Sequence, residues 1–248
     1  MKNLRNVALI LLCGVYTLFW TGGVFTHAMF GGPPSNATWA APFFLLVAGF
    51  LVLLSSDGVT CARLVLAGAV GLAAEGVGVH FGYPFGGYEY TDVLAPRLLG
   101  VPIVMACAWF VLVAFVRQLL LTFAMPRVAF ILVSAVVLTS FDLVIDPLAA
   151  GPLDYWRWDT KGLYYGIPAS NFAGWLLVSV AVMSAAGVAR TRNRVHEATG
   201  ITIVAFFTLL SLVYAQWLVT IIGVALLIGC ALMIRSNKRQ AVQPKPAS

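Results

Sequence analysis

The residues best suited to chemistry in this sequence are its acids, which are few and clustered. Seven of the nine lie between positions 75 and 159, namely Glu75, Glu89, Asp92, Asp142, Asp146, Asp154 and Asp159. Glu75 and Asp142 fall inside long apolar stretches, and Asp146 follows one helical turn later, just before Pro147, where we expect the helix to end. Acids at such depth cost roughly 2.5–3.5 kcal/mol on membrane-insertion scales, so they normally face a bundle interior and mark a functional site.

Two buried carboxyls that face each other predict general acid–base chemistry. Burial disfavours the ionised form and the like charges repel, so one carboxyl tends to keep a proton while the other ionises. Glu75 and Asp142 fit such a pair, with Asp146 as a third candidate. The alternative is a structural role, in which each acid pairs with an arginine or with a helix N-terminus.

Aromatic residues crowd the segments that follow the buried acids. They are Phe81, Tyr83, Phe85, Tyr88, Tyr90, Tyr155, Trp156, Trp158, Tyr164 and Tyr165. Some of them suit the aromatic belt where a bilayer meets water, but there are more than a belt requires. Aromatic walls with few acids suit a long apolar ligand, and the ring quadrupoles attract a cationic intermediate.

Two parts of the chain share a pattern of spacing. In each, a tryptophan follows the proline of a Gly-x-Pro motif by seven residues, as in Gly100-Val-Pro102 with Trp109 and Gly166-Ile-Pro168 with Trp175. Seventeen residues separate Glu75 from Asp92, and seventeen separate Asp142 from Asp159. The pattern predicts a parallel internal repeat about an axis along the membrane normal, with Glu75 and Asp142 at equal depth.

The composition identifies the elements that must position these residues as membrane helices. Of the 248 residues, 61% are hydrophobic and 10% are charged, whereas soluble domains carry about 25% charged residues. The mean hydropathy is +0.94. These values exclude an ordinary soluble globule, a disordered chain and a nucleic-acid binder. The four cysteines form no C-x-x-C pair, so they indicate neither a disulfide framework nor a zinc site.

Apolar stretches of spanning length predict an all-α polytopic membrane bundle of about eight helices. The first six are expected at Val7–Phe25, Ala40–Leu54, Leu64–His80, Val101–Val116, Val128–Ile145 and Phe172–Ala189. A last stretch, Gly200–Ile234, is too long for one span, so we expect two helices with a turn near Tyr214–Trp217. The proposed repeat then relates spans three–four to spans five–six.

Basic residues predict the orientation of these spans. Twelve of the fifteen Lys and Arg residues fall on the side of the N-terminus and only Arg97, Arg157 and Lys161 on the other. By the positive-inside rule, both termini are cytoplasmic in the cell membrane. Residues 1–234 are expected to form one membrane domain, and residues 235–248 a basic, disordered cytoplasmic tail.

Several sequence runs resemble the CruF-like carotenoid biosynthesis membrane proteins. These are His80-Phe-Gly-Tyr-Pro-Phe-Gly-Gly-Tyr-Glu-Tyr-Thr91, Gly100-Val-Pro102 with Trp109, Phe141-Asp142 through Asp146-Pro147, Trp156-Arg-Trp158, and Tyr165-Gly-Ile-Pro-Ala-Ser-Asn-Phe-Ala-Gly-Trp175. The resemblance implies a carotenoid hydratase, which adds water to the terminal double bond of an acyclic carotenoid such as lycopene. It implies no cofactor, and as partners the carotenoid, membrane lipid and other membrane enzymes of the carotenoid pathway.

The resemblance supplies no catalytic residue set, so the site is assigned by chemistry. Glu75, Asp142 and Asp146 are the acid–base candidates, while Asp92 and Asp159 are expected to position water. Asn171 is expected either to cap its helix or to hold the water. The expected substrate-binding residues are His80, Tyr83, Tyr88, Tyr90, Trp109, Trp156, Trp158, Tyr165, Asn171 and Trp175.

Two other functions fit the same residues. The spacing Asp142-x-x-x-Asp146 suits a magnesium–diphosphate site on a helix face, as in a membrane prenyltransferase, although a second such motif is missing. A non-enzymatic carotenoid-binding or transport protein is the other alternative. A magnesium requirement distinguishes the first, and pigment recovered unchanged distinguishes the second.

Overall fold

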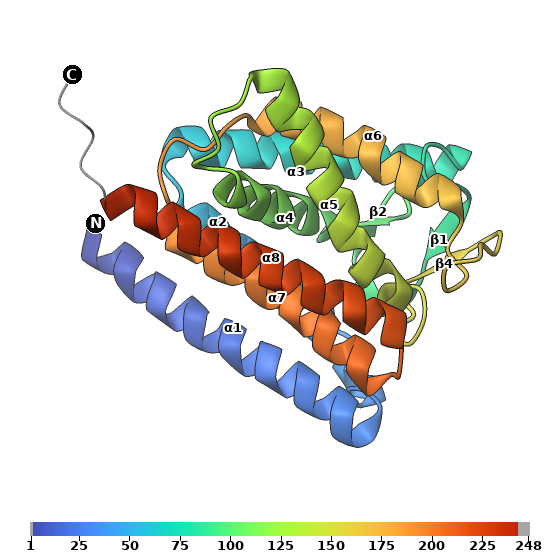
Figure 1. The fold of residues 1–248 in the computed structure, drawn as a ribbon. Helices are drawn as coiled ribbons and strands as arrows, with labels where there is room; N and C mark the ends of the chain where they lie inside the picture. The colour runs from blue at the N-terminus through green and yellow to red at the C-terminus, as the bar shows by residue number, and fades with distance from the viewer. Residues whose placement is uncertain (1, 243–248) are drawn as a thin grey trace.

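The computed structural model describes residues 2–242, which form a bundle of eight α-helices (Figure 1). The helices are α1 Lys2–Phe30, α2 Ala40–Ser55, α3 Gly58–Phe81, α4 Met105–Leu119, α5 Arg127–Ala149, α6 Ala169–Ala186, α7 Arg194–Val213 and α8 Trp217–Val242. Short strands complete the fold: β1 Tyr88–Tyr90, β2 Arg97–Leu98, β3 Val101–Pro102 and β4 Trp156–Trp158. Within the described residues, seven helices are long and apolar enough to cross a membrane, which confirms a multi-pass helical membrane protein.

Helix α4, the shortest of the eight described helices, lies at the centre of the bundle. It has 15 residues, 12 of them buried, and it packs against α2, α3, α5 and α7. At about 1.5 Å per residue it is roughly 22 Å long, less than a bilayer core. Its predicted start at Val101 is wrong, because Val101–Pro102 instead pairs with Arg97–Leu98 in a small hairpin and the helix begins at Met105.

The break in the last apolar stretch is confirmed. Helix α7 ends at Val213, α8 begins at Trp217, and Ala215 between them has a positive φ of 54°. Helix α8 continues to Val242, inside the segment predicted to be a disordered tail, and residues 243–248 of that tail lie outside the described residues.

The helices run up and down, so the described chain begins and ends at the same end of the bundle (Figure 1). We call this the basic end, and it includes the connections 56–57, 120–126 and 187–193. The opposite end, called the ribbon end, carries β1 and β4, which pair as an antiparallel ribbon. Helix α3 stops at the ribbon end at Gly82, whose φ of 67° suits glycine and turns the chain back over the bundle.

Candidate active site

Glu75 is buried in α3 and accepts hydrogen bonds from three neutral side chains. Tyr88 and Tyr90 donate their hydroxyls to Oε2, the latter at 3.0 Å, and the Trp109 indole donates to Oε1 at 3.1 Å. All three donors come from other elements, β1 and α4. Both carboxylate oxygens are therefore satisfied without a cation, an arrangement that suits an ionised acceptor.

Two glycines of α3 allow these donors to approach. A Cβ at Gly71 would fall on the Trp109 indole, and a Cβ at Gly78 would lie 3.1 Å from the Tyr88 hydroxyl and 2.9 Å from the Phe85 ring. Only a residue without a side chain leaves this space. Neither glycine was predicted to belong to the site, although Gly71 stands one turn before Glu75 and such small residues typically mark close packing between membrane helices.

The ribbon presents its aromatic face to the acids. Tyr88 pairs with Trp158 and Tyr90 with Trp156. Because side chains alternate along a strand, these rings share one face while Glu89 and Arg157 point to the other. Trp156 donates its indole N–H to Asp146 Oδ1 at 2.7 Å. One ribbon thus holds carboxylates of two different helices, α3 and α5.

Asp142 and Asp146 lie one turn apart on α5 and share a single amide. Asn171, near the start of α6, donates Nδ2 to Oδ2 of both acids, at 2.8 Å in each case. The three side chains are almost fully buried, with exposed fractions of 0%, 1% and 2%. The hydrogen bonds therefore make Asp146 the immediate partner of Asp142, whereas Glu75 is held separately by tyrosine and tryptophan.

No basic side chain neutralises these acids among the described residues. The salt bridges there involve Asp92, Asp154 and Glu197. The buried acids therefore do not pair with an arginine in this part of the chain, which was one form of the alternative structural role. Two buried polar atoms beside the acids also have no hydrogen-bond partner within residues 2–242, namely Asp142 Oδ1 and Trp158 Nε1. Unsatisfied buried groups cost about 1–3 kcal/mol each, so these atoms are favourable points for a water or ligand to bind.

Two tyrosines outside the membrane helices, Tyr88 and Tyr164, have pKa values that respond to the buried carboxyls. Burial, followed by the charge of Glu75, raises the pKa of Tyr88, and Asp146 adds to the increase. Burial, with Tyr165 and then Asp142 and Asp146, raises the pKa of Tyr164 to about 12. Both phenols therefore remain neutral hydrogen-bond donors near pH 7, and Tyr88 lies close enough to acids of both helices for their charges to act on it.

Tyr164 also explains how a proline is accommodated in α5. The prediction that the helix ends at Pro147 is wrong, because α5 continues to Ala149. A proline cannot donate to the carbonyl four residues earlier. That carbonyl belongs to Leu143, and it accepts from the Tyr164 hydroxyl at 2.8 Å instead. The carbonyl freed by Pro147 is thereby satisfied. Tyr164 was absent from the predicted substrate-binding residues.

Trp109 and Trp175, the tryptophans of the two Gly-x-Pro motifs, stack with ring centroids 4.3 Å apart and an interplanar angle of 24°. The pairing of β1 with β4 likewise joins corresponding parts of the two segments. These contacts place the matched motifs face to face. The internal repeat itself stays a prediction.

Five predicted site residues are not part of the buried group. Asp92 and Asp159 are exposed, and Asp92 forms an ion pair with Arg97. His80, Tyr83 and Tyr165 are also exposed, and the His80 ring bonds the Gly76 carbonyl of its own helix. The residues that do converge are Glu75, Tyr88, Tyr90, Trp109, Asp142, Asp146, Trp156, Trp158, Asn171 and Trp175.

Comparison with known proteins places this geometry in a biochemical context. Residues 39–234 match the family described as carotenoid biosynthesis protein. The chain is also 33% identical over 176 residues to a bisanhydrobacterioruberin hydratase of Haloarcula japonica; the match covers 64% of this chain and 58% of that protein. No solved structure matches. Because the family match spans most of its length, the chain belongs to the carotenoid biosynthesis protein family.

Proposed function

We propose that this protein hydrates the terminal double bond of an acyclic carotenoid end by acid catalysis. The observation that carries the proposal is the buried group of three carboxyls without a basic partner, in a membrane bundle of a carotenoid biosynthesis family. The similarity to a protein named as a hydratase favours the same class of reaction. Hydration of an alkene needs a proton source and water, and no redox chemistry.

In the proposed reaction, Asp142 and Asp146 share one proton and deliver it to the less substituted carbon of the double bond. The alkene π electrons form the new C–H bond and leave a tertiary cation. Water attacks that cation and loses a proton, which returns to the carboxyl pair. The unbonded Asp142 Oδ1 is suited to holding the reacting proton or water, and repulsion between neighbouring carboxyls favours the shared-proton state.

Glu75 has a different role in this proposal. Its three neutral donors stabilise an ionised carboxylate, and a fixed negative charge stabilises a nearby cation best where water is excluded. The faces of Tyr88 and Trp158 add quadrupole attraction for the same cation. The sequence paired Glu75 with Asp142 as acid and base, whereas the hydrogen bonds favour Asp146 in that pair.

The closed geometry adds a requirement. Asp142 has no exposed surface, so a carotenoid end reaches it only after neighbouring side chains move. A magnesium–diphosphate site at the same place would first need to displace the Asn171 amide that bridges the two aspartates. For this reason we favour hydration over the prenyltransferase alternative.

Co-expression with the enzymes of lycopene synthesis, followed by mass analysis of the extracted pigments, tests the proposal. The expected product is a pigment heavier than its precursor by one water. Washed membranes should form the same product equally well when a metal chelator is present. Activity abolished by the chelator and restored by magnesium would favour prenyl transfer. Pigment bound to the purified protein but chemically unchanged would favour a binding or transport role.

A further inference from the structure

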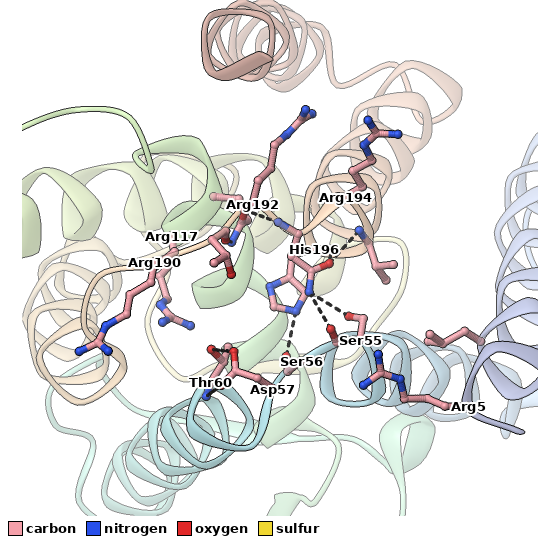
Figure 2. A pocket seen from close by; sticks show the side chains of 16 residues that line it. Arg5, Ser55, Ser56, Asp57, Thr60, Arg117, Arg190, Arg192, Arg194 and His196 are labelled. Carbon is pink, nitrogen blue, oxygen red and sulfur yellow. Dashed lines mark hydrogen bonds between the residues drawn. The ribbon is translucent and has the colours of Figure 1, made fainter. Parts of the chain in front are cut away.

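The basic end contains a cavity of about 460 Å³ that the proposed reaction does not use (Figure 2). It is open to one side and lined by the start of α1, the connection from α2 to α3, the end of α4 and residues 189–196. Its five basic residues with fixed positive charge are Arg5, Arg117, Arg190, Arg192 and Arg194. They come from three separate parts of the chain, so the fold gathers them.

The acids near this cavity leave most of its positive charge uncompensated. Arg192 is neutralised by Glu197 through two bonds of 2.7 and 2.6 Å. Asp57 is the one lining acid, and its carboxylate accepts from the Thr60 backbone N–H and hydroxyl, which holds the pKa of Asp57 below its usual value. Within the described side chains, the other four arginines form no salt bridge.

Arg117 is not explained by membrane orientation alone, because the positive-inside rule needs only exposed charges in loops. Arg117 is 2% exposed. Its Nε and Nη2 donate to the carbonyls of Gly187 and Val188 at 2.7 and 3.2 Å, while Nη1 has no acceptor among the side chains and backbone groups that the structure describes. A guanidinium held by two backbone carbonyls at the edge of a cavity keeps donors for an anion.

His196 provides a second, independent indication of a ligand. The ring is 1% exposed and lies between the arginines of the cavity (Figure 2). Its Nε2 contacts the Val52 carbonyl and the Ser56 hydroxyl at 3.1 and 3.0 Å, whereas Nδ1 is buried without a partner in the described part of the chain. Because Nε2 must donate to the carbonyl, Nδ1 of the neutral ring is an acceptor, and only a donor on the ligand, such as a hydroxyl of a phosphate ester or a P–O–H group, would satisfy it.

We propose that this cavity binds a phosphate group. Guanidinium groups match phosphate oxygens through paired N–H donors, which makes arginine the preferred residue for phosphate. The volume exceeds what an inorganic phosphate fills, leaving room for a substituent or a second phosphate. The cavity lies where the helices end, and helix ends of a bilayer-spanning bundle are expected near the lipid headgroups. The phosphate therefore belongs either to an anionic phospholipid or to a soluble phosphate ester.

The experiment uses the full-length protein purified in a neutral detergent. Native mass spectrometry measures retention of phosphatidylglycerol against phosphatidylcholine, and thermal unfolding measures stabilisation by inorganic pyrophosphate. The test variant is Arg190→Gln with Arg194→Gln. The matched control is Arg127→Gln with Arg235→Gln, which removes the same charge from exposed positions at the same end that do not line the cavity.

We expect the test variant to bind the phosphate probe about thirtyfold more weakly, since one basic side chain near an anionic surface contributes about 1 kcal/mol, or about fivefold. The control variant should bind as the wild type does. Binding of phosphatidylglycerol alone identifies the lipid as the source, and binding of pyrophosphate alone identifies a soluble ester. Equal loss of binding in both variants would overturn the proposal. So would a wild-type protein that retains phosphatidylglycerol no better than phosphatidylcholine and is not stabilised by pyrophosphate.

Discussion

The two ends of the bundle each gather charged residues of one sign, but they hold them differently. At the ribbon end, three acids are held by neutral donors from tyrosine, tryptophan and asparagine, and the group is closed to solvent. At the basic end, arginines line an open cavity, and the buried Arg117 is held by backbone carbonyls. A buried ion without a partner costs several kcal/mol. Hydrogen bonds reduce that cost at both ends without cancelling the charge.

The difference between the two ends indicates what each is suited to do. Proton transfer to an alkene and capture of a cation benefit from the exclusion of water, because electrostatic stabilisation is strongest in a low dielectric. Anion binding needs access from solvent or from the lipid surface. The closed acidic group therefore suits chemistry, and the open basic cavity suits binding.

The largest expected effect comes from Asp142→Asn, which removes the acid with the unbonded oxygen while preserving its size. Loss of a general acid typically lowers the rate about 10²–10⁴-fold. Hydrated carotenoid, measured by chromatography and mass and normalised to protein in the membrane, should nearly vanish. Glu89→Gln is the matched control, because Glu89 points outward from the ribbon. Wild-type product from the Asp142 variant would refute the assignment.

Glu75→Gln should also reduce the product strongly, by about 10²-fold or more, since electrostatic stabilisation of a developing charge is removed. The variant keeps the side chain in place but replaces one accepting oxygen by a donor, so it conflicts with Tyr88, Tyr90 or Trp109. We expect a lower unfolding temperature together with the lost activity. Stability unchanged and product unchanged would show that Glu75 is dispensable.

Gly71→Ala tests how tightly the acidic group is built. The added methyl would fall on the Trp109 indole, and overpacking of this kind costs typically 1–3 kcal/mol. We expect a clear drop in the unfolding temperature measured in detergent. Gly76→Ala on the same helix is the control, because nothing lies within 4 Å of its added carbon. Equal stability of the two variants would contradict the close contact.

Arg190→Gln with Arg194→Gln should leave carotenoid hydration unchanged, because sites that share no contacts usually behave independently. The measurement is the same pigment assay, made in lipid that contains phosphatidylglycerol. A product level that falls in parallel with phosphate binding would show that the two ends of the bundle are coupled and do not act independently.

The smallest effect is expected from reporter tags that test orientation. A tag between Ser211 and Gln216 and a tag at the C-terminus should report opposite sides of the membrane, with the C-terminus cytoplasmic. Helices α7 and α8 run antiparallel across the turn at residues 214–216. Both tags on one side would show that this pair does not cross the membrane as a hairpin.

The sequence by itself determined the class of fold and singled out the buried acids as candidate site residues. Apolar stretches of spanning length are a local property, and so is the excess length that required a break near Tyr214. The cost of a carboxyl in an apolar helix identified Glu75 and Asp142 before any contact was known. The sequence also shows more aromatic residues near these acids than an aromatic belt at the membrane interface requires.

Only the tertiary structure decided which of these residues act together. The pairing of β1 with β4 selects the inward rings and leaves Asp92 and Asp159 exposed, outside the buried group. The bridge from Asn171 to both aspartates, and the bond from Tyr164 that accommodates Pro147, join segments about twenty or more residues apart. Periodicity shows which face of an element is buried. The partner of each polar atom depends on packing between distant segments, which no local pattern encodes.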